Sequence, residues 1–136
     1  MEGAEEILRS LCEKYRLYIV TNGSISVQKG RIESAGLKNY VQDIFISEAL
    51  GYNKPRKEYF DLCFDRIPNF CKENTIMVGD SLSADIQGGK NAGLLTVWFN
   101  PENTVNDSSV APDYEISELT ELKSVISCID SSSFCS

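Results

Sequence analysis

TIMVGDSLSADIQGGKNAG (residues 75–93) is the stretch that decides the fold of this chain. A short apolar run ends at a Gly-Asp pair, and a second acid, Asp85, follows Asp80 at a spacing of about one helical turn. The segment behind them has helical character but holds Gly88 and Gly89, each of which costs a helix ~1 kcal/mol unless another element packs closely there. We interpret the stretch as a buried strand that passes directly into a helix, with two carboxylates at the junction.

Strands and helices alternate on both sides of this stretch. Short continuous apolar runs are typical of strands buried on both faces, and apolar residues spaced by three and four are typical of amphipathic helices. These patterns predict strands over 16–21, 43–47, 75–80, 94–99 and 114–116, and helices over 4–15, 24–35, 59–67, 83–92 and 119–129. Such alternation implies parallel strands joined by crossover helices. We therefore expect a single α/β domain over 1–136, a Rossmann-like parallel sheet with flanking helices, and a frayed tail at 131–136.

The composition excludes several classes of protein. The chain has 136 residues, 42% of them hydrophobic, which suits one domain with its own core. Its net charge of −7 argues against nucleic-acid binding, because an acidic surface repels phosphate backbones, although a local pocket can still be cationic. The absence of histidine excludes His-based triads and His-ligated zinc.

The cysteines and the first residues bear on location. Five cysteines without a CxxC pair or regular spacing predict reduced thiols and a cytoplasmic protein. The polar, acidic first ten residues do not resemble a signal peptide, and no apolar run approaches the ~20 residues that span a bilayer. We expect no membrane association.

In a parallel sheet ligands bind beyond the carboxyl ends of the strands, so the residues that follow each strand are the candidates. Thr21-Asn22-Gly23-Ser24 follow the first strand, where hydroxyls and the N–H groups of a helix start favour phosphate. The plainer interpretation is a turn with Ser24 as a helix N-cap. Lys54, before a proline, follows the second strand and is either a clamp for an anion or a solvated surface lysine.

The third strand ends at the acidic pair. Asp80 and Asp85 at one crevice repel each other unless a cation or a lysine lies between them. Mg²⁺ prefers such oxygen ligands and keeps several of its waters. The alternative is that Asp80 and Ser81 only cap a helix.

Three segments together resemble a known family. YIVTNGS (18–24), NKP (53–55) and VGDSLSADIQGGKNAGLLTVWFNP (78–101) are similar to motifs II, III and IV of the haloacid dehalogenase-like (HAD) hydrolases, in the phosphatase branch that includes noncanonical pyrimidine nucleotidases. The similarity extends over roughly residues 3 to 129 and implies a Mg²⁺-dependent hydrolase of small phosphorylated metabolites that works through an aspartyl-phosphate.

The resemblance also implies roles for single residues. Thr21 would bind a phosphate oxygen, with the backbone at Asn22 and Gly23 as further donors. Lys54 would neutralise the phosphate and the attacking carboxylate. The resemblance makes Asp80 a metal ligand, whereas Asp85 would bind the metal through water or hold Lys54 in position. The catalytic residues implied are thus Lys54, Thr21 and Asp85.

One motif of the family has no counterpart. The Asp-x-Asp segment that supplies the nucleophile does not occur in these 136 residues, and neither does the cap that follows it. The resemblance therefore implies the C-terminal part of a HAD core, without its first strand and with little or no turnover of its own. That strand would lie between the strands ending at Thr21 and Gly79. We expect these two to pair directly, or a homodimer to cover the exposed surface; a segment supplied from elsewhere is the third possibility.

Two alternative functions belong to other classes. A remnant of the HAD fold that binds phosphate or a partner without catalysis would retain the binding motifs and lack the nucleophile. A receiver-like signalling domain also uses acids and a lysine on an α/β sheet, but it needs an acidic pair near the start and a lysine late in the chain. The observed order does not supply that arrangement.

Overall fold

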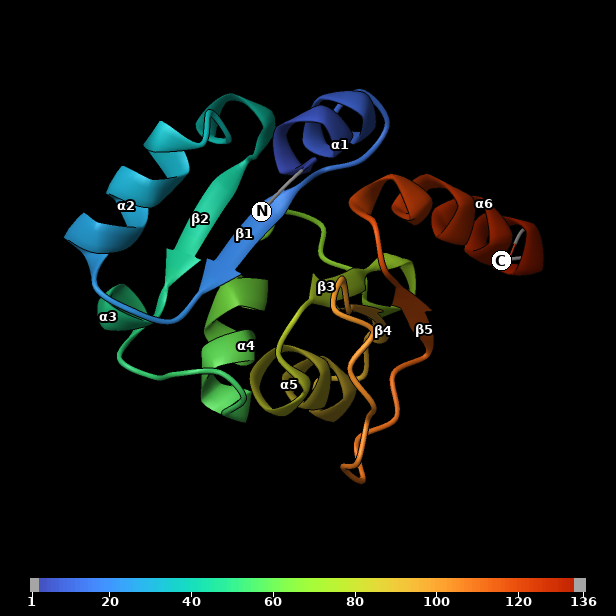
Figure 1. The fold of residues 1–136 in the computed structure, drawn as a ribbon. Coiled ribbons are helices and arrows are strands. Elements are labelled where there is room, and N and C mark those ends of the chain that lie inside the picture. The colour runs from blue at the N-terminus through green and yellow to red at the C-terminus, as the bar shows by residue number, and fades with distance from the viewer. Residues whose placement is uncertain (1–2, 134–136) are drawn as a thin grey trace.

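The computed structural model describes residues 3–133 and confirms an α/β fold of parallel strands with flanking helices (Figure 1). Its elements in chain order are α1 (Ala4–Leu11), β1 (Tyr18–Thr21), α2 (Ile25–Ser34), η1 (Lys38–Tyr40), β2 (Asp43–Ile46), α3 (Ser47–Leu50), α4 (Lys57–Asp65), η2 (Lys72–Asn74), β3 (Ile76–Gly79), η3 (Leu82–Ile86), α5 (Gln87–Asn91), β4 (Leu95–Phe99), β5 (Tyr114–Ile116), η4 (Leu119–Glu121) and α6 (Leu122–Ser133). The part of the expected frayed tail at 131–133 thus continues α6, and 134–136 lie outside the described residues.

The strands form two separate parallel sheets. β1 pairs with β2, and β3, β4 and β5 form the second sheet in that order. Within residues 3–133 β1 does not pair with β3, so the expected direct closure of the sheet is wrong. The reason lies between the strands: the ammonium of Lys54 bonds to the Val20 carbonyl of β1 and to Asp85, whose side chain packs on Gly79 of β3. Contacts between these side chains, and not a backbone ladder, thus connect the ends of β1 and β3. Whether a homodimer covers this surface stays a prediction.

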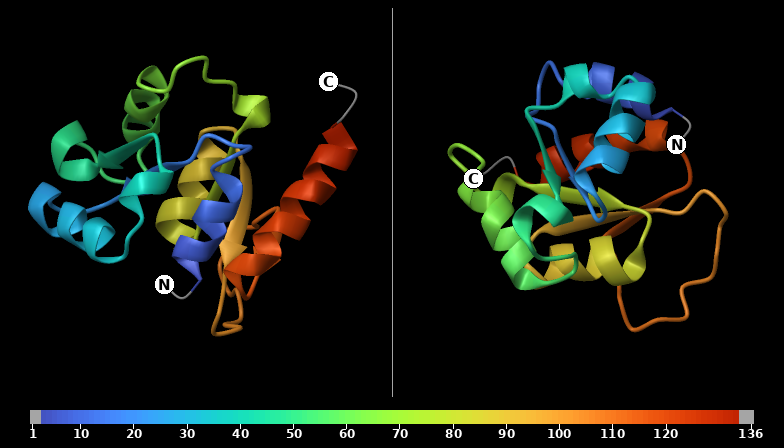
Figure 2. Two further views of the ribbon diagram at one scale, coloured as in Figure 1. Left: turned by 90° about the horizontal axis from the view of Figure 1, so that it is seen from above. Right: turned by 90° about the vertical axis from the view of Figure 1, so that its left-hand side faces the viewer.

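Helices on both faces hold the two sheets together. α1, α2 and α6 lie on one face, and α4 and α5 lie on the other (Figures 1 and 2). One apolar cluster joins Phe45 of β2 to Met77 of β3 through Tyr59 and Phe60 of α4. Within it the Tyr59 hydroxyl donates to the Phe45 carbonyl at 2.7 Å. The sheets are therefore bridged by side-chain packing across α4.

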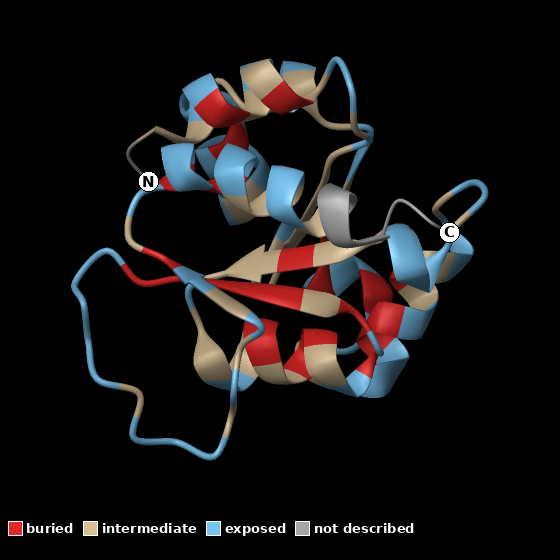
Figure 3. Ribbon diagram, turned by 90° about the vertical axis from the view of Figure 1, so that its right-hand side faces the viewer, coloured by how far each residue is buried: buried red, intermediate tan, exposed pale blue. Residues whose placement is uncertain are grey.

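A second apolar cluster lies on the opposite face. It packs Ile7 and Leu11 of α1 against Val97 of β4, Leu119 of η4 and Leu122 of α6. The amphipathic pattern predicted for the first helix is thus explained by burial against the other end of the chain. In Figure 3 the strands of the second sheet are coloured buried and intermediate, beside the largely exposed loop at 101–112.

Across residues 3–133, none of the helices combines the length and the apolar character needed to cross a bilayer.

Candidate functional site

The centre of the site is a buried ion pair between Lys54 and Asp85. The Lys54 Nζ contacts Asp85 Oδ1 and also donates to the Val20 carbonyl at 3.2 Å. Each side chain of the pair has only 9% of its surface exposed. The other carboxylate oxygen of Asp85 accepts the Ser81 N–H at 3.2 Å. The structure therefore brings Lys54 and Asp85 together at the carboxyl ends of β1 and β3, as the sequence predicted.

Asn22 holds the backbone of Lys54. Its side-chain Oδ1 accepts the Lys54 N–H at 2.9 Å, and its Nδ2 donates to the Lys54 carbonyl at 3.4 Å. The sequence analysis assigned Asn22 to phosphate through its backbone, whereas its side chain clamps the loop that carries the lysine. The Asn22 carbonyl in turn accepts Gln28 Nε2 at 2.9 Å, which ties the loop to α2.

The loop after β1 differs from expectation at Gly23. The Gly23 N–H already donates to Ser47 Oγ at 2.8 Å, so it is not the free phosphate donor that the sequence predicted. The Thr21 hydroxyl makes only a long contact, 3.3 Å, with the Asn22 carbonyl. Ser24 is the N-cap of α2, because its Oγ accepts the Val27 N–H at 3.4 Å. Ser24 thus belongs to the start of α2, whereas the Thr21 hydroxyl contacts only the carbonyl of the next residue.

Two residues at the end of β2 were missed by the sequence analysis. Ser47 bonds the Gly23 N–H, and the Glu48 carboxylate accepts the Ile25 N–H at the start of α2 at 2.8 Å. Both follow the second strand directly, in the same kind of position from which Thr21 and Asp80 were selected. Selecting the residues that follow each strand would therefore also have identified Ser47 and Glu48.

The turn after β3 is shaped by the contact between Gly79 and Asp85. A Cβ at position 79 would overlap the Asp85 side chain, so only glycine leaves room for the carboxylate over the strand end. The chain then forms a π-helical turn, η3, in which the Ile86 N–H reaches the Ser81 carbonyl at 3.1 Å. The Ser81 hydroxyl caps this turn by accepting the Ala84 N–H at 3.1 Å. The expected single helix over 83–92 is therefore η3 followed by α5.

Asp80 differs from Asp85 in its surroundings. It is exposed, and its carboxylate has no hydrogen-bond or ion-pair partner among residues 3–133, while its backbone carbonyl accepts Trp98 Nε1 at 3.1 Å. In the described part of the chain no three acids, cysteines or histidines gather as a metal cluster. The structure thus offers one free carboxylate, Asp80, and one that is engaged on both oxygens, Asp85.

Tyr59 and Cys63 of α4 lie in the core behind the site. Burial raises the pKa of the Tyr59 hydroxyl and raises the pKa of the Cys63 thiol to about 12. Both groups therefore remain protonated at neutral pH. They provide packing, and neither is available as a base.

The profile of the family described as haloacid dehalogenase-like hydrolase matches residues 1–99, and the chain belongs to this family. It is 45% identical over 126 residues to the HAD-hydrolase YfnB of Bacillus subtilis, covering 93% of this chain and 54% of that protein. The magnesium-bound crystal structure of YfnB superposes with a TM-score of 0.90, over 93% of this chain and 55% of that one.

Two further relatives carry named activities. The chain is 42% identical over 131 residues to the pyrimidine 5′-nucleotidase PynA of Streptococcus pneumoniae, covering 96% of this chain and 54% of PynA. It is 36% identical over 134 residues to the N-acylneuraminate-9-phosphatase of Rattus norvegicus, covering 95% of this chain and 52% of the relative. The chain spans about half the length of the curated relatives it matches.

Proposed function

We propose that this chain carries the phosphate-binding and metal-binding part of a Mg²⁺-dependent phosphate monoester hydrolase. The observation behind the proposal is the Lys54–Asp85 pair, held at the carboxyl ends of β1 and β3 and flanked by Thr21 and Asp80. Membership of the HAD-like hydrolases and relatives named as a nucleotidase and a phosphatase support it. The ligand is a small phosphorylated metabolite, and a cytoplasmic location remains our expectation.

Lys54 and Thr21 would bind the phosphate. An ammonium has three N–H donors, and the contacts with Val20 and Asp85 use two of them, which leaves one for an anion. The Thr21 hydroxyl adds a neutral donor from the end of β1. Fixed hydrogen-bond donors and a largely buried cation stabilise the negative charge on the phosphate oxygens during phosphoryl transfer. Asp85 and Asn22 would act by positioning Lys54.

Asp80 fits a magnesium ion as its direct ligand. Mg²⁺ is held in proteins through one or two carboxylates and retains several waters, which the exposed, unpartnered Asp80 allows. Asp85 has both oxygens engaged, so the structure favours the alternative in which it holds Lys54. When bound, the ion would supply positive charge to a phosphate oxygen.

Phosphate binding tests this proposal. We expect isothermal titration calorimetry to detect inorganic phosphate with this chain, more strongly when Mg²⁺ is present. Lys54→Met should abolish binding, whereas Lys57→Met removes the same charge from an exposed position that pairs with Asp61 and should leave it unchanged. Circular dichroism checks that both variants fold. Equal phosphate affinity in the two variants would contradict the role of Lys54.

Catalysis by these 136 residues alone is a separate question. They contain no Asp-x-Asp pair, so we expect no turnover of p-nitrophenyl phosphate with Mg²⁺. A steady rate well above background would contradict this expectation and would require another nucleophile, with Asp80 as the first candidate. Binding without turnover also fits the second candidate, a non-catalytic phosphate-binding remnant, which the missing Asp-x-Asp pair favours for this polypeptide.

A further inference from the structure

A pocket of about 680 Å³ opens beside the loop that follows β1. Its wall comes from three segments: Asn22 and Gly23 after β1, Ser47 and Glu48 at the start of α3, and Tyr52 and Arg56 before α4. We call it the side pocket. Because Asn22 also clamps the backbone of Lys54, the side pocket and the phosphate-binding groups share a wall.

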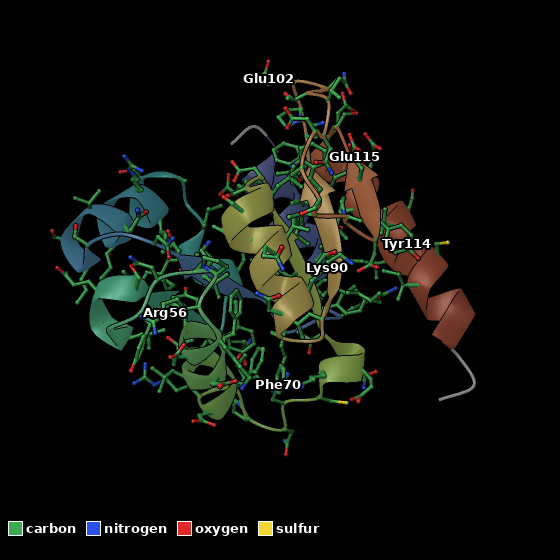
Figure 4. The ribbon with its side chains drawn as sticks, turned by 90° about the horizontal axis from the view of Figure 1, so that it is seen from below. Arg56, Phe70, Lys90, Glu102, Tyr114 and Glu115 are labelled. Carbon is green, nitrogen blue, oxygen red and sulfur yellow. The ribbon has the colours of Figure 1, made fainter. Side chains whose placement is uncertain are left out.

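The charges in the side pocket do not favour a second anion. The Arg56 guanidinium is paired with Glu58 at 3.0 Å and lies over the Tyr52 ring, 5.1 Å from its centroid. Its positive charge therefore has a partner, in an ion pair whose side chains are 61% and 48% exposed. The Glu48 carboxylate keeps a negative charge at the wall, with Oε1 accepting the Ile25 N–H and no contact at Oε2 among the described residues. Figure 4 shows Arg56 beside α3 and the start of α4.

Two groups of the side pocket remain available to a ligand: the second carboxylate oxygen of Glu48 and the aromatic ring of Tyr52. Glu48 Oε2 can accept from a hydroxyl, and a hydrogen bond to a carboxylate is stronger than a neutral one. Tyr52 is the aromatic side chain among the polar residues of the side pocket, and it stays 37% exposed with Arg56 over its ring. An aromatic ring next to hydrogen-bonding groups is the combination that holds an uncharged polar ring.

We propose that the side pocket binds the leaving group of the phosphate ester, as a subsite for an uncharged, hydroxylated ring such as a sugar. Tyr52 provides the platform and Glu48 accepts a hydroxyl, while the phosphate lies at Thr21 and Lys54. This assignment rests on the proposed phosphate site. Two kinds of ester share the chemistry, sugar phosphates and ribonucleoside monophosphates, and both carry hydroxyls on a ring next to the phosphate.

Calorimetric titration of this chain with four probes separates the contributions. Inorganic phosphate and methyl phosphate report on the phosphate site alone, and ribose 5-phosphate and uridine 5′-monophosphate add the ring. We expect ribose 5-phosphate to bind about tenfold more tightly than methyl phosphate, the gain that one hydrogen bond to a charged group gives. A further gain for uridine 5′-monophosphate identifies the ester as a nucleotide, and equal affinity identifies it as a sugar phosphate.

The variants assign the gain to the side pocket. Tyr52→Ala and Glu48→Gln should each reduce the preference for ribose 5-phosphate over methyl phosphate severalfold and leave inorganic phosphate unchanged. Tyr52→Phe keeps the ring and should keep the preference. If methyl phosphate and ribose 5-phosphate bind equally, or if Tyr52→Ala keeps the preference, the subsite is wrong and the phosphate site stands. If none of the four probes binds, both proposals fail.

Discussion

Lys54 carries its positive charge where only 9% of its side chain meets solvent. Removing two charges from water is costly, and the attraction within a buried pair offsets that cost only while both partners and their hydrogen bonds are in place. Val20 and Ser81 supply those hydrogen bonds, and Asn22 holds the Lys54 backbone. The pair therefore adds little net stability but makes the loss of either partner expensive.

Asp85→Asn tests whether the loss of one partner of the buried ion pair destabilises the protein. It leaves the Lys54 ammonium without a counterion, and we expect the free energy of unfolding to fall by about 3 kcal/mol. The double variant Lys54→Met/Asp85→Asn should be more stable than Asp85→Asn alone, because the uncompensated charge is gone. Urea denaturation followed by circular dichroism measures both values.

Asp61→Asn is the control for that experiment. It breaks an ion pair of ordinary length, 2.8 Å from Lys57, between side chains that are more than half exposed, and should cost less than about 1 kcal/mol. Similar losses from Asp85→Asn and Asp61→Asn would contradict a buried role for the Lys54 pair.

The sequence predicted Thr21, Lys54, Asp80 and Asp85 because each comes shortly after a strand. It did not predict that Gly23 would be engaged by Ser47. That contact depends on the register that pairs Thr21 with Ile46, which places the two strand ends level with each other. Hydrophobic periodicity identifies strands but does not determine which residues of two strands lie side by side.

At the scale of elements, the approach of α5 to α4 depends on Gly88. A Cβ at position 88 would overlap the ring of Phe60, which is only 2% exposed and cannot move aside. The glycine pair seen in the sequence is thus explained by close packing, as predicted. The single helix expected over 83–92 is η3 followed by α5, and Asp85, which packs on Gly79, lies within η3.

Gly88→Ala should lower the free energy of unfolding by about 1–3 kcal/mol, since overpacking strains the neighbouring core. Gly30→Ala is the matched variant, because position 30 of α2 is exposed and has nothing within 4 Å of an added Cβ. It should stabilise the protein by up to about 1 kcal/mol through helix propensity. Chemical denaturation of both variants measures whether each substitution raises or lowers the free energy of unfolding. Stabilisation by both substitutions would show that α5 has room to move.

At the scale of the whole molecule, the two sheets depend on the cluster that spans them. Cys63 lies in this cluster with 1% exposure, and burial raises the pKa of its thiol to about 12 from 9.0. The folded state keeps the thiol protonated, while the unfolded state loses the proton above pH 9. Stability from this group is therefore complete below pH 9 and is lost as the pH rises towards 12.

We expect the free energy of unfolding, measured by urea denaturation, to fall between pH 8 and pH 10.5, by on the order of 1 kcal/mol per pH unit once the unfolded thiol ionises. Cys63→Ala should lower stability at pH 8 and reduce this slope. The exposed Cys71→Ser should change neither. A slope that is the same in Cys63→Ala and the unaltered chain would show that other groups cause the loss.

The sequence did not predict how the sheets join. Alternating strands and helices indicate a parallel α/β arrangement, and that prediction is confirmed. Direct pairing of β1 with β3 was wrong, because the ion pair and the helix that bridge them involve residues far apart in sequence. Contacts of this kind do not change the hydrophobic pattern of either strand, so the sequence does not reveal them.

The packing of α1 has a consequence for synthesis. Ile7 and Leu11 are translated well before Leu119 and Leu122, which cover them in the folded chain. Until then the apolar stripe of the first helix faces solvent, and contacts between distant segments form late. The nascent chain therefore presents that stripe to solvent until Leu119 and Leu122 have emerged, and in that interval a ribosome-associated chaperone can bind it.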